Sequence, residues 1–587
     1  MKSFVIAAVL AAAVSALPAD TRNDHSKPSY SIPLHDKNPK ARASALATKR
    51  AGWTYREYPL GGAPLPAGPL ANQTLAEQDK TWLPVLAVVQ NQTVQDTNKA
   101  KKDLDASGPF TSLDDYARLY DNEWQTIIPG ELLVPGMKTN YTDDRLFSMA
   151  RLSANPYRTR RVQHKEKLLF PVDNAASITG LSLEHLRDQG RLFSVDYSDM
   201  ADLPRSSNYG AICQAFFYIC PKTGDFLPLA VNAMYSNSSL IYTPEDSPDD
   251  WMLGKLLFNQ NDNWYITYAH ISFSHSASDF AYLTAIRSLS ESHPLMALIE
   301  RFESTPLNIR PTLYTGIITS GAIDKYYPWT GDGARLYANQ VFESGEASNF
   351  QSNYIETRLE NAGLINSQFG PELKSFPFWE DTSVVVGLMR TFFNEVINSY
   401  YTSDLAVRQD KELQGWAQEA QDAGLPDFPK AISSRKQLAD MLTHIDYLGT
   451  VVHGVISSNG VYGFMASLPF APTSFYKPLP TAKGATDLIQ YMPDIYQAVA
   501  QVSTLIAASR AAWINGNQTM THMWDDEAML ARMNSRTRAA NVDFKNAMND
   551  FSDEVRARTF DSEGLNRGMP VIWRPLDPNS APYWSVV

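Results

Sequence analysis

The distribution of apolar positions along the chain indicates a mainly helical protein. From Trp251 onward, apolar residues recur at helical spacing in long segments that end at proline or glycine. Strand character is rare, and its best example is 215–235, where two apolar runs flank the turn "PKTGD". No repeat and no shift in composition divides the chain after about residue 140, so we expect a single large helical domain with a few short strands. The clearest predicted helices cover 264–289, 381–401, 434–456 and 492–514.

The N-terminus carries the features of a secretory signal peptide. The stretch "MKSFVIAAVLAAAVSALPA" has a lysine, an apolar core and small residues at Val14 and Ala16, which is the pattern that signal peptidase cleaves. We therefore expect residues 1–16 to be removed and the protein to be extracellular. Five glycosylation sequons agree with a secreted glycoprotein; they lie at Asn72, Asn91, Asn140, Asn237 and Asn517.

The segment that follows the signal peptide is predicted to be a propeptide. Residues 17–50 are polar, lack helical or strand periodicity and end in the dibasic pair Lys49–Arg50. We expect a furin-like protease to cut after this pair, which leaves 51–587 as the mature domain. The alternative is a disordered surface arm that stays attached.

Composition and charge exclude two classes of partner. The formal net charge of -12 argues against nucleic acid, which favours a basic face. No apolar run after the signal segment is long enough to span a bilayer.

The only two cysteines, Cys213 and Cys220, are seven positions apart in a predicted strand, too far for a disulfide. Unless the segment bends, we expect two buried free cysteines, with the chain stabilised by core burial instead of disulfides.

Three histidines in apolar helical segments are the candidate functional residues. His270 and His275 lie in "AHISFSH", and five residues on an ideal helix rotate by about 140°. They face the same point only if the helix contains a π-bulge, which often marks a functional site. With His453 on another helix, they could supply three nitrogen ligands to a metal. Each histidine by itself would more commonly be an ordinary core residue.

Two further residues lie one helical turn from these histidines. Ser457 follows His453 by four positions and shares its helical face, whereas Asn459 faces elsewhere if the helix continues. Asp279 follows His275 at the same spacing and could orient its ring. A surface or capping carboxylate is an equal alternative for Asp279.

Taken in order, these residues resemble the lipoxygenase family, specifically its secreted fungal manganese branch. The family's first metal motif, His-x4-His on a long central helix, is matched by His270 and His275, and its second motif begins with a histidine, matched by His453. The resemblance covers roughly residues 143–587. Other matching stretches are "RLSANP", "GRLFSVDYSDM", "FFYICPKTGDFLPLAV", "SLSESHPLMALIERFESTPLNI", "SYYTSDLAVRQDKELQGW" and "PLPTAKG".

The resemblance implies a fold and a metal site. The fold is a single lipoxygenase-type helical catalytic domain over 51–587, without the N-terminal β-barrel (PLAT) domain of plant and animal members. One manganese ion (Mn²⁺/Mn³⁺) per chain is expected, with iron as the alternative. Ser457 replaces the Asn or His usual at the fourth ligand position, and a neutral hydroxyl is a weaker ligand. The implied ligands are His270, His275, His453, Ser457 and the terminal carboxylate of Val587, in the apolar end "PYWSVV".

The resemblance also implies a reaction. Lipoxygenases dioxygenate polyunsaturated fatty acids, here linoleic or α-linolenic acid, to hydroperoxides. A metal-bound hydroxide abstracts hydrogen from a bis-allylic carbon, O₂ adds to the radical, and no other catalytic residue is needed. Arg510 resembles a tether for the fatty-acid carboxylate; the alternative is an arginine that favours a helix C-terminus. A monomer is expected.

Two other hypotheses about function compete with that of an active lipoxygenase. The first is a secreted lipid-binding protein on the same scaffold that has lost catalysis, which Ser457 keeps open. The second is a metallohydrolase with a zinc-bound water, which would need a nearby general base. No such base stands out in the histidine-bearing segments.

Overall fold

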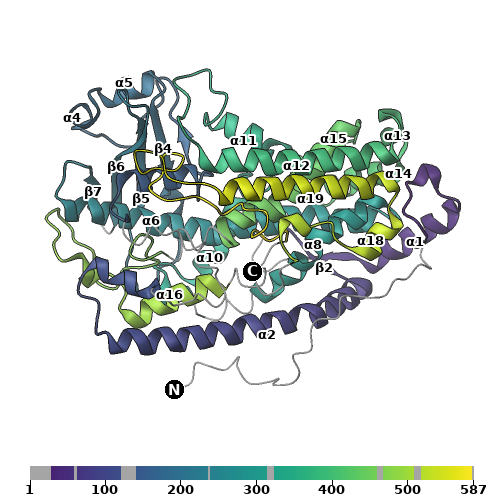
Figure 1. Ribbon diagram of the computed structural model, residues 1–587, viewed down its shortest axis with the longest axis horizontal. Helices are drawn as coiled ribbons and strands as arrows, with labels where there is room; N and C mark the ends of the chain where they lie inside the picture. The colour runs from purple at the N-terminus through teal and green to yellow at the C-terminus, as the bar shows by residue number, and fades with distance from the viewer. Residues whose placement is uncertain are drawn as a thin grey trace.

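Long helices run along one axis of the molecule and a small sheet lies at one end, as Figure 1 shows for the computed structural model. The structure describes residues 28–57, 62–120, 140–235, 238–313, 321, 323–458, 467–507 and 517–584. The predicted mainly helical fold is confirmed. Within these ranges, no helix is long and apolar enough to cross a membrane.

The main sheet is antiparallel and has the order β3-β4-β5-β6-β7. Its central strands β5 and β6 flank the "PKTGD" turn as predicted. Successive residues of β5 enter different cores, Phe216 a small one and Phe217 the main one, so both faces of the sheet are covered. Sequence periodicity missed the short outer strands. The strands are β3 (Arg160–Arg161), β4 (Leu192–Asp196), β5 (Ile212–Ile219), β6 (Phe226–Tyr235) and β7 (Ser238–Tyr242).

A long central helical unit begins at the sheet. It consists of α6 (Pro248–His270), the π-helix η5 (Ile271–Ser276) and α7 (Ala277–Ser288). The helix starts 16 residues before the predicted start at residue 264 because its first half buries polar side chains, which hide the apolar periodicity. One of them, Asn261, donates to the carbonyl oxygen of Ala211 at 2.9 Å. Such buried amides need partners of this kind.

A second interrupted helical unit packs against the first. It comprises α15 (Arg435–Asp446), the π-helix η8 (Tyr447–Val452), His453 and the π-helix η9 (Gly454–Ser458). Both π-helical segments η5 and η8 also contact α8 (Pro294–Leu313). The predicted helix at 434–456 is therefore confirmed in extent.

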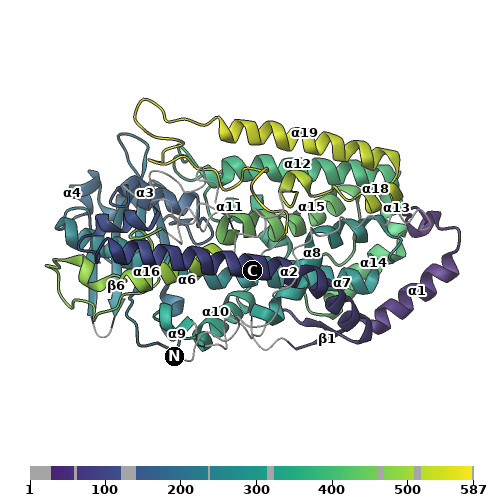
Figure 2. The same cartoon turned by 60° about the horizontal axis from the view of Figure 1, so that its bottom comes forward.

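The remaining helices surround these two units. The predicted helix at 381–401 is confirmed by α12 (Pro377–Tyr400), and the one at 492–514 by α16 (Ile495–Ala507), as far as the described residues reach. Figure 2 shows α2 lying across one face beside α16. The others are α2 (Pro69–Ala106), α3 (Asp144–Met149), α4 (Ala175–Thr179), α5 (Leu183–Asp188), α9 (Ile323–Tyr326), α10 (Gly331–Glu343), α11 (Ile355–Asn361), α13 (Asp404–Gln409), α14 (Lys411–Asp422), α18 (Glu527–Arg532) and α19 (Ser535–Arg556).

The N-terminal segment belongs to the folded body. Helix α1 (Pro39–Gly52) contains the dibasic pair, and the short strands β1 (Thr54–Arg56) and β2 (Leu65–Ala67) follow it. Buried Arg42 binds Glu412 through two bonds, Nε–Oε1 at 2.5 Å and Nη2–Oε2 at 2.9 Å. The alternative of a disordered arm is therefore wrong for residues 28–50. Cleavage after Arg50 stays a prediction.

The two cysteines are both free. Cys213 is buried in β5 and Cys220 is half-buried at the end of that strand. The prediction of two free cysteines is confirmed, and that of burial holds for Cys213 alone.

A buried histidine away from the metal candidates makes the fold sensitive to acid. His444 lies in α15 with its ring centroid 4.9 Å from both Phe350 and Tyr354. Burial, and then the charge of Arg358, lower the pKa of His444 to about 3. The unfolded chain takes up this proton near pH 6.5, so the stability present above that pH is lost as the pH falls toward 3. At pH 4 the loss is about 3 kcal/mol.

We expect His444→Phe to flatten the decline of Tm between pH 6.5 and 4, because phenylalanine fills the aromatic site without binding a proton. Thermal unfolding at several pH values measures this. The exposed His185 offers the control, because its ring bonds to the hydroxyl of Ser182 and not to an acid, and His185→Phe should leave the decline unchanged. An unchanged slope in the His444 variant would contradict the assignment.

Candidate metal centre

Three buried histidines from two helical units converge at the centre of the fold. His270 closes α6, His275 lies in η5, and His453 lies between η8 and η9. One ring nitrogen of each lies within 4.8 Å of those of the other two. The ring centroids are 5.5 Å apart for His270–His275, 5.7 Å for His270–His453 and 5.0 Å for His275–His453. The predicted convergence is confirmed.

The π-helix η5 is what brings the first two histidines together. On a regular helix their five-residue spacing would turn His275 away by about 140°. A π-helix spreads each turn over more residues and so reduces this rotation. Because η5 spans Ile271–Ser276, the π-turn expected from the spacing is confirmed.

The hydrogen bonding of His270 fits a metal ligand. Its Nδ1 lies 3.0 Å from the carbonyl oxygen of Ile266 and donates to it, which leaves the lone pair on Nε2. Nε2 is buried and has no hydrogen-bond partner among the described residues. Buried polar atoms are rarely left this way, so this nitrogen is suited to bind a cation.

The electrostatics of the cluster also fit a cation. Burial lowers the pKa of His270 to about 4. Burial and the neighbouring His275 and His270 hold the pKa of His453 well below its ordinary value. Both imidazoles are therefore neutral at physiological pH, the protonation state in which a histidine binds a metal. Nitrogen ligands of this kind suit manganese, iron and other first-row metals.

The side chains of three predicted site residues lie outside the described structure. The backbone of Ser457 belongs to η9, but its side chain lies outside the described structure. Arg510 and Val587 both lie outside the described residues. Asp279 is fully buried, so the surface alternative for it is wrong.

The sequons differ in accessibility. Asn72 and Asn91 are exposed on α2, Asn517 is exposed in a turn, and Asn237 lies outside the described residues. Asn140 is half-buried and its Nδ2 donates to the carbonyl oxygen of Pro570 at 3.1 Å. A glycan attaches at this nitrogen, so in the folded chain Asn140 is the least accessible of the described acceptors.

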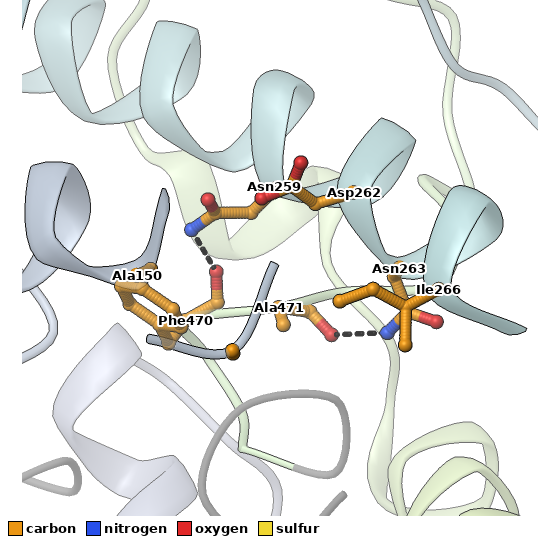
Figure 3. A pocket seen from close by; sticks show the side chains of 8 residues that line it. Ala150, Asn259, Asp262, Asn263, Ile266, Phe470 and Ala471 are labelled. Carbon is orange, nitrogen blue, oxygen red and sulfur yellow. Dashed lines mark hydrogen bonds between the residues drawn. The ribbon is translucent and has the colours of Figure 1, made fainter. Parts of the chain in front are cut away.

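A small cavity lies along α6, upstream of His270 (Figure 3). Its volume is about 20 Å³, which is room for about one water-sized molecule. Figure 3 shows Asn259 bonded to the carbonyl of Phe470, and Asn263 to that of Ala471, at 2.7 and 3.4 Å. A fatty-acid chain cannot fit there. The wall is formed by Ala150, Ala154, Asn259, Asp262, Asn263, Ile266, Phe470 and Ala471.

Sequence reasoning missed two buried acids close to the histidine-bearing helices. Glu303 in α8 and Asp446 at the end of α15 are both 0% exposed. Their signal in the sequence is a carboxylate within an apolar helical segment, which is unusual for a buried position.

Comparison with known proteins identifies close relatives. A family model described as lipoxygenase matches residues 164–572. A manganese lipoxygenase of Colletotrichum gloeosporioides is 35% identical over 94% of this chain and 92% of its own length. One of Nakataea oryzae is 36% identical over 97% of this chain and 93% of its own.

Solved structures agree with these matches. The structure of a manganese lipoxygenase superposes with a TM-score of 0.91 at 34% identity and covers 95% of this chain and 99% of that one. A coral 8R-lipoxygenase superposes with a TM-score of 0.74 at 20% identity, over 95% of this chain and 83% of that one. The second match supports the fold alone.

Proposed function

This chain belongs to the lipoxygenase family, and we propose that it is a secreted manganese lipoxygenase acting on linoleic and α-linolenic acids. Its family makes it an oxidoreductase that adds dioxygen to polyunsaturated fatty acids. The observation that carries the finer proposal is the buried cluster of His270, His275 and His453.

Manganese is the metal that best agrees with the relatives. The manganese lipoxygenases named above are 34–36% identical to this chain. The histidines would hold the ion, with Ser457 and the carboxylate of Val587 as further proposed ligands. When bound, manganese supplies the one-electron redox couple needed to break a weak bis-allylic C–H bond before dioxygen adds.

The chain's own residues contribute orientation and a dry environment. The carbonyl of Ile266 fixes the ring of His270, as outer partners of metal-binding histidines do. Burial of all three rings excludes bulk water, which protects a substrate radical from side reactions. Arg510 is the proposed anchor for the fatty-acid carboxylate.

Secretion completes the proposal. Removal of residues 1–16, cleavage after Arg50 and glycans at the five sequons all rest on sequence patterns. The exposed Asn72, Asn91 and Asn517 support the glycan positions best.

The test measures the metal content of the secreted protein together with the ultraviolet absorbance of conjugated diene after linoleic acid is added. About one manganese per chain and a rising diene signal are expected. Iron with the same signal would keep the reaction and replace the metal. Bound metal without diene would favour the lipid carrier, and no metal would refute the proposal.

Deleting Val587 tests the proposed role of the terminal carboxylate. The shortened enzyme should lose diene formation, because the metal loses its one proposed anionic ligand, while fatty-acid binding measured by fluorescence stays nearly intact. Adding one alanine after Val587 is the matched control for the position of the carboxylate and should also reduce the rate. Full activity in both variants would remove Val587 from the site.

A further inference from the structure

Three buried carboxyl groups gather on the helices that carry or contact the histidine cluster. Asp279 lies in α7 four residues after His275, Asp446 lies seven residues before His453, and Glu303 lies in α8. All three side chains are 0% exposed. The elements that hold them pack against one another and against η5 and η8.

The three groups influence one another. Burial, and then the carboxylate of Asp279, raise the pKa of Glu303 well above its ordinary value, with Asp446 as a further contributor. Burial raises the pKa of Asp446 well above its ordinary value. Glu303 also lies against η8, because a Cβ added at Gly449 would come within 2.7 Å of its Oε1. Gly449 is four residues from His453.

Two of these acids lack a compensating charge among the described residues. The oxygens of Glu303 and Asp446 form no hydrogen bond of good geometry in this part of the chain. Their polar neighbours are Ser278 and Asp279 for Glu303 and Thr450 for Asp446, and neither set includes a lysine or an arginine. Other buried acids are paired: Asp381 receives Arg558 Nη2 at 2.6 Å and Nη1 at 2.9 Å. An unpaired buried carboxyl is costly and is rarely kept without a reason.

A metal ion in the histidine cluster supplies that reason. Imidazole ligands are neutral, and the carboxylate of Val587, the one anionic ligand proposed, offsets only one unit of the charge of a di- or trivalent cation. A buried cation needs nearby negative charge to be stable there. The unpaired acids lie in the helices packed around the cluster and provide this charge.

We propose that Glu303 and Asp446, with Asp279 beside them, form a buried counter-charge for the metal and thereby set its affinity. These acids act through the electric field and are not ligands. In the metal-free protein the same groups are destabilising, since each must be kept neutral in an apolar interior. The inference rests on the proposed function in one respect, the presence of a metal at the histidines.

The proposal predicts opposite changes in two quantities. Glu303→Gln and Asp446→Asn should each weaken manganese binding by about 10- to 100-fold, the range known for residues that support metal ligands indirectly. The same variants should raise the Tm of the metal-free protein by about 2 °C, because a costly buried acid is removed. Manganese titration against a competing chelator, and thermal unfolding after chelation, measure the two quantities.

Asp381→Asn is the matched control. Asp381 is equally buried but is paired with Arg558 and Arg567, so its loss should lower the Tm and leave manganese affinity unchanged. Glu303→Met removes the same carboxyl group without introducing a buried amide. It should behave like Glu303→Gln, which would show that the amide itself does not cause the effect.

Unchanged manganese affinity in Glu303→Gln, Glu303→Met and Asp446→Asn would overturn the proposal. So would a lower Tm of the metal-free variants, which would mean that the acids are structural. If the unaltered protein binds no manganese, the proposed function fails first. If it binds manganese and the variants bind it equally well, only the counter-charge fails.

Discussion

Replacing His275 with glutamine is expected to remove the metal and to lower kcat/KM for linoleic acid by at least about 10³-fold. His275 is fully buried and lies closest to His453, with ring centroids 5.0 Å apart. Glutamine has no imidazole lone pair, and two remaining nitrogens hold a first-row metal poorly. Metal analysis and the initial rate of diene formation measure the two effects.

His293→Gln is the control for this experiment. His293 is also fully buried, but its Nε2 lies 3.2 Å from the hydroxyl of Tyr401 and 3.5 Å from Asp410 Oδ2, in a separate polar group. This variant should retain its metal. A His275→Gln enzyme that keeps both metal and rate would show that the reaction occurs elsewhere.

Replacing Arg42 with alanine is expected to destabilise the protein by about 3–5 kcal/mol, the usual cost of removing one partner from a buried ion pair. The guanidinium of Arg42 bridges α1 to Glu412 of α14 and also binds Asp36 at 3.0 Å. Its loss leaves the carboxylate of Glu412 buried without its main partner. Denaturant unfolding of the uncleaved chain, in which residues 17–50 are still attached, measures the change.

A double-mutant cycle makes this prediction specific. Arg42→Ala combined with Glu412→Gln should cost much less than the sum of the single changes, because the buried carboxylate that Arg42 neutralises at Glu412 is then also absent. The half-exposed pair Arg160–Glu166 is the control, and Arg160→Ala should cost at most about 1 kcal/mol. Additive effects at Arg42 and Glu412 would mean that the N-terminal segment does not depend on this contact.

The histidine cluster was predictable because its signal is local. Apolar periodicity placed His270, His275 and His453 on helices, and the five-residue spacing then required a π-turn. The convergence of two distant segments came from the family resemblance, since no local pattern states which helices meet.

Other features were hidden from sequence reasoning for physical reasons. The start of α6 was missed because Asn261 and its neighbours are buried polar residues whose partners lie far away in sequence. The docked α1 was missed because polar, basic stretches are usually solvated, whereas the buried contact of Arg42 depends on Glu412, 370 residues away. The same assumption about charged residues hid Glu303 and Asp446.

The π-helix η5 also bears on how this protein can evolve. Five residues of π-helix rotate the chain nearly as much as four residues of α-helix, so η5 absorbs one extra residue locally and leaves α7 in register. A one-codon insertion into an ordinary α-helix whose two histidines were four residues apart would therefore produce this arrangement. Neither the two histidine rings nor the buried face of α7 would have to move.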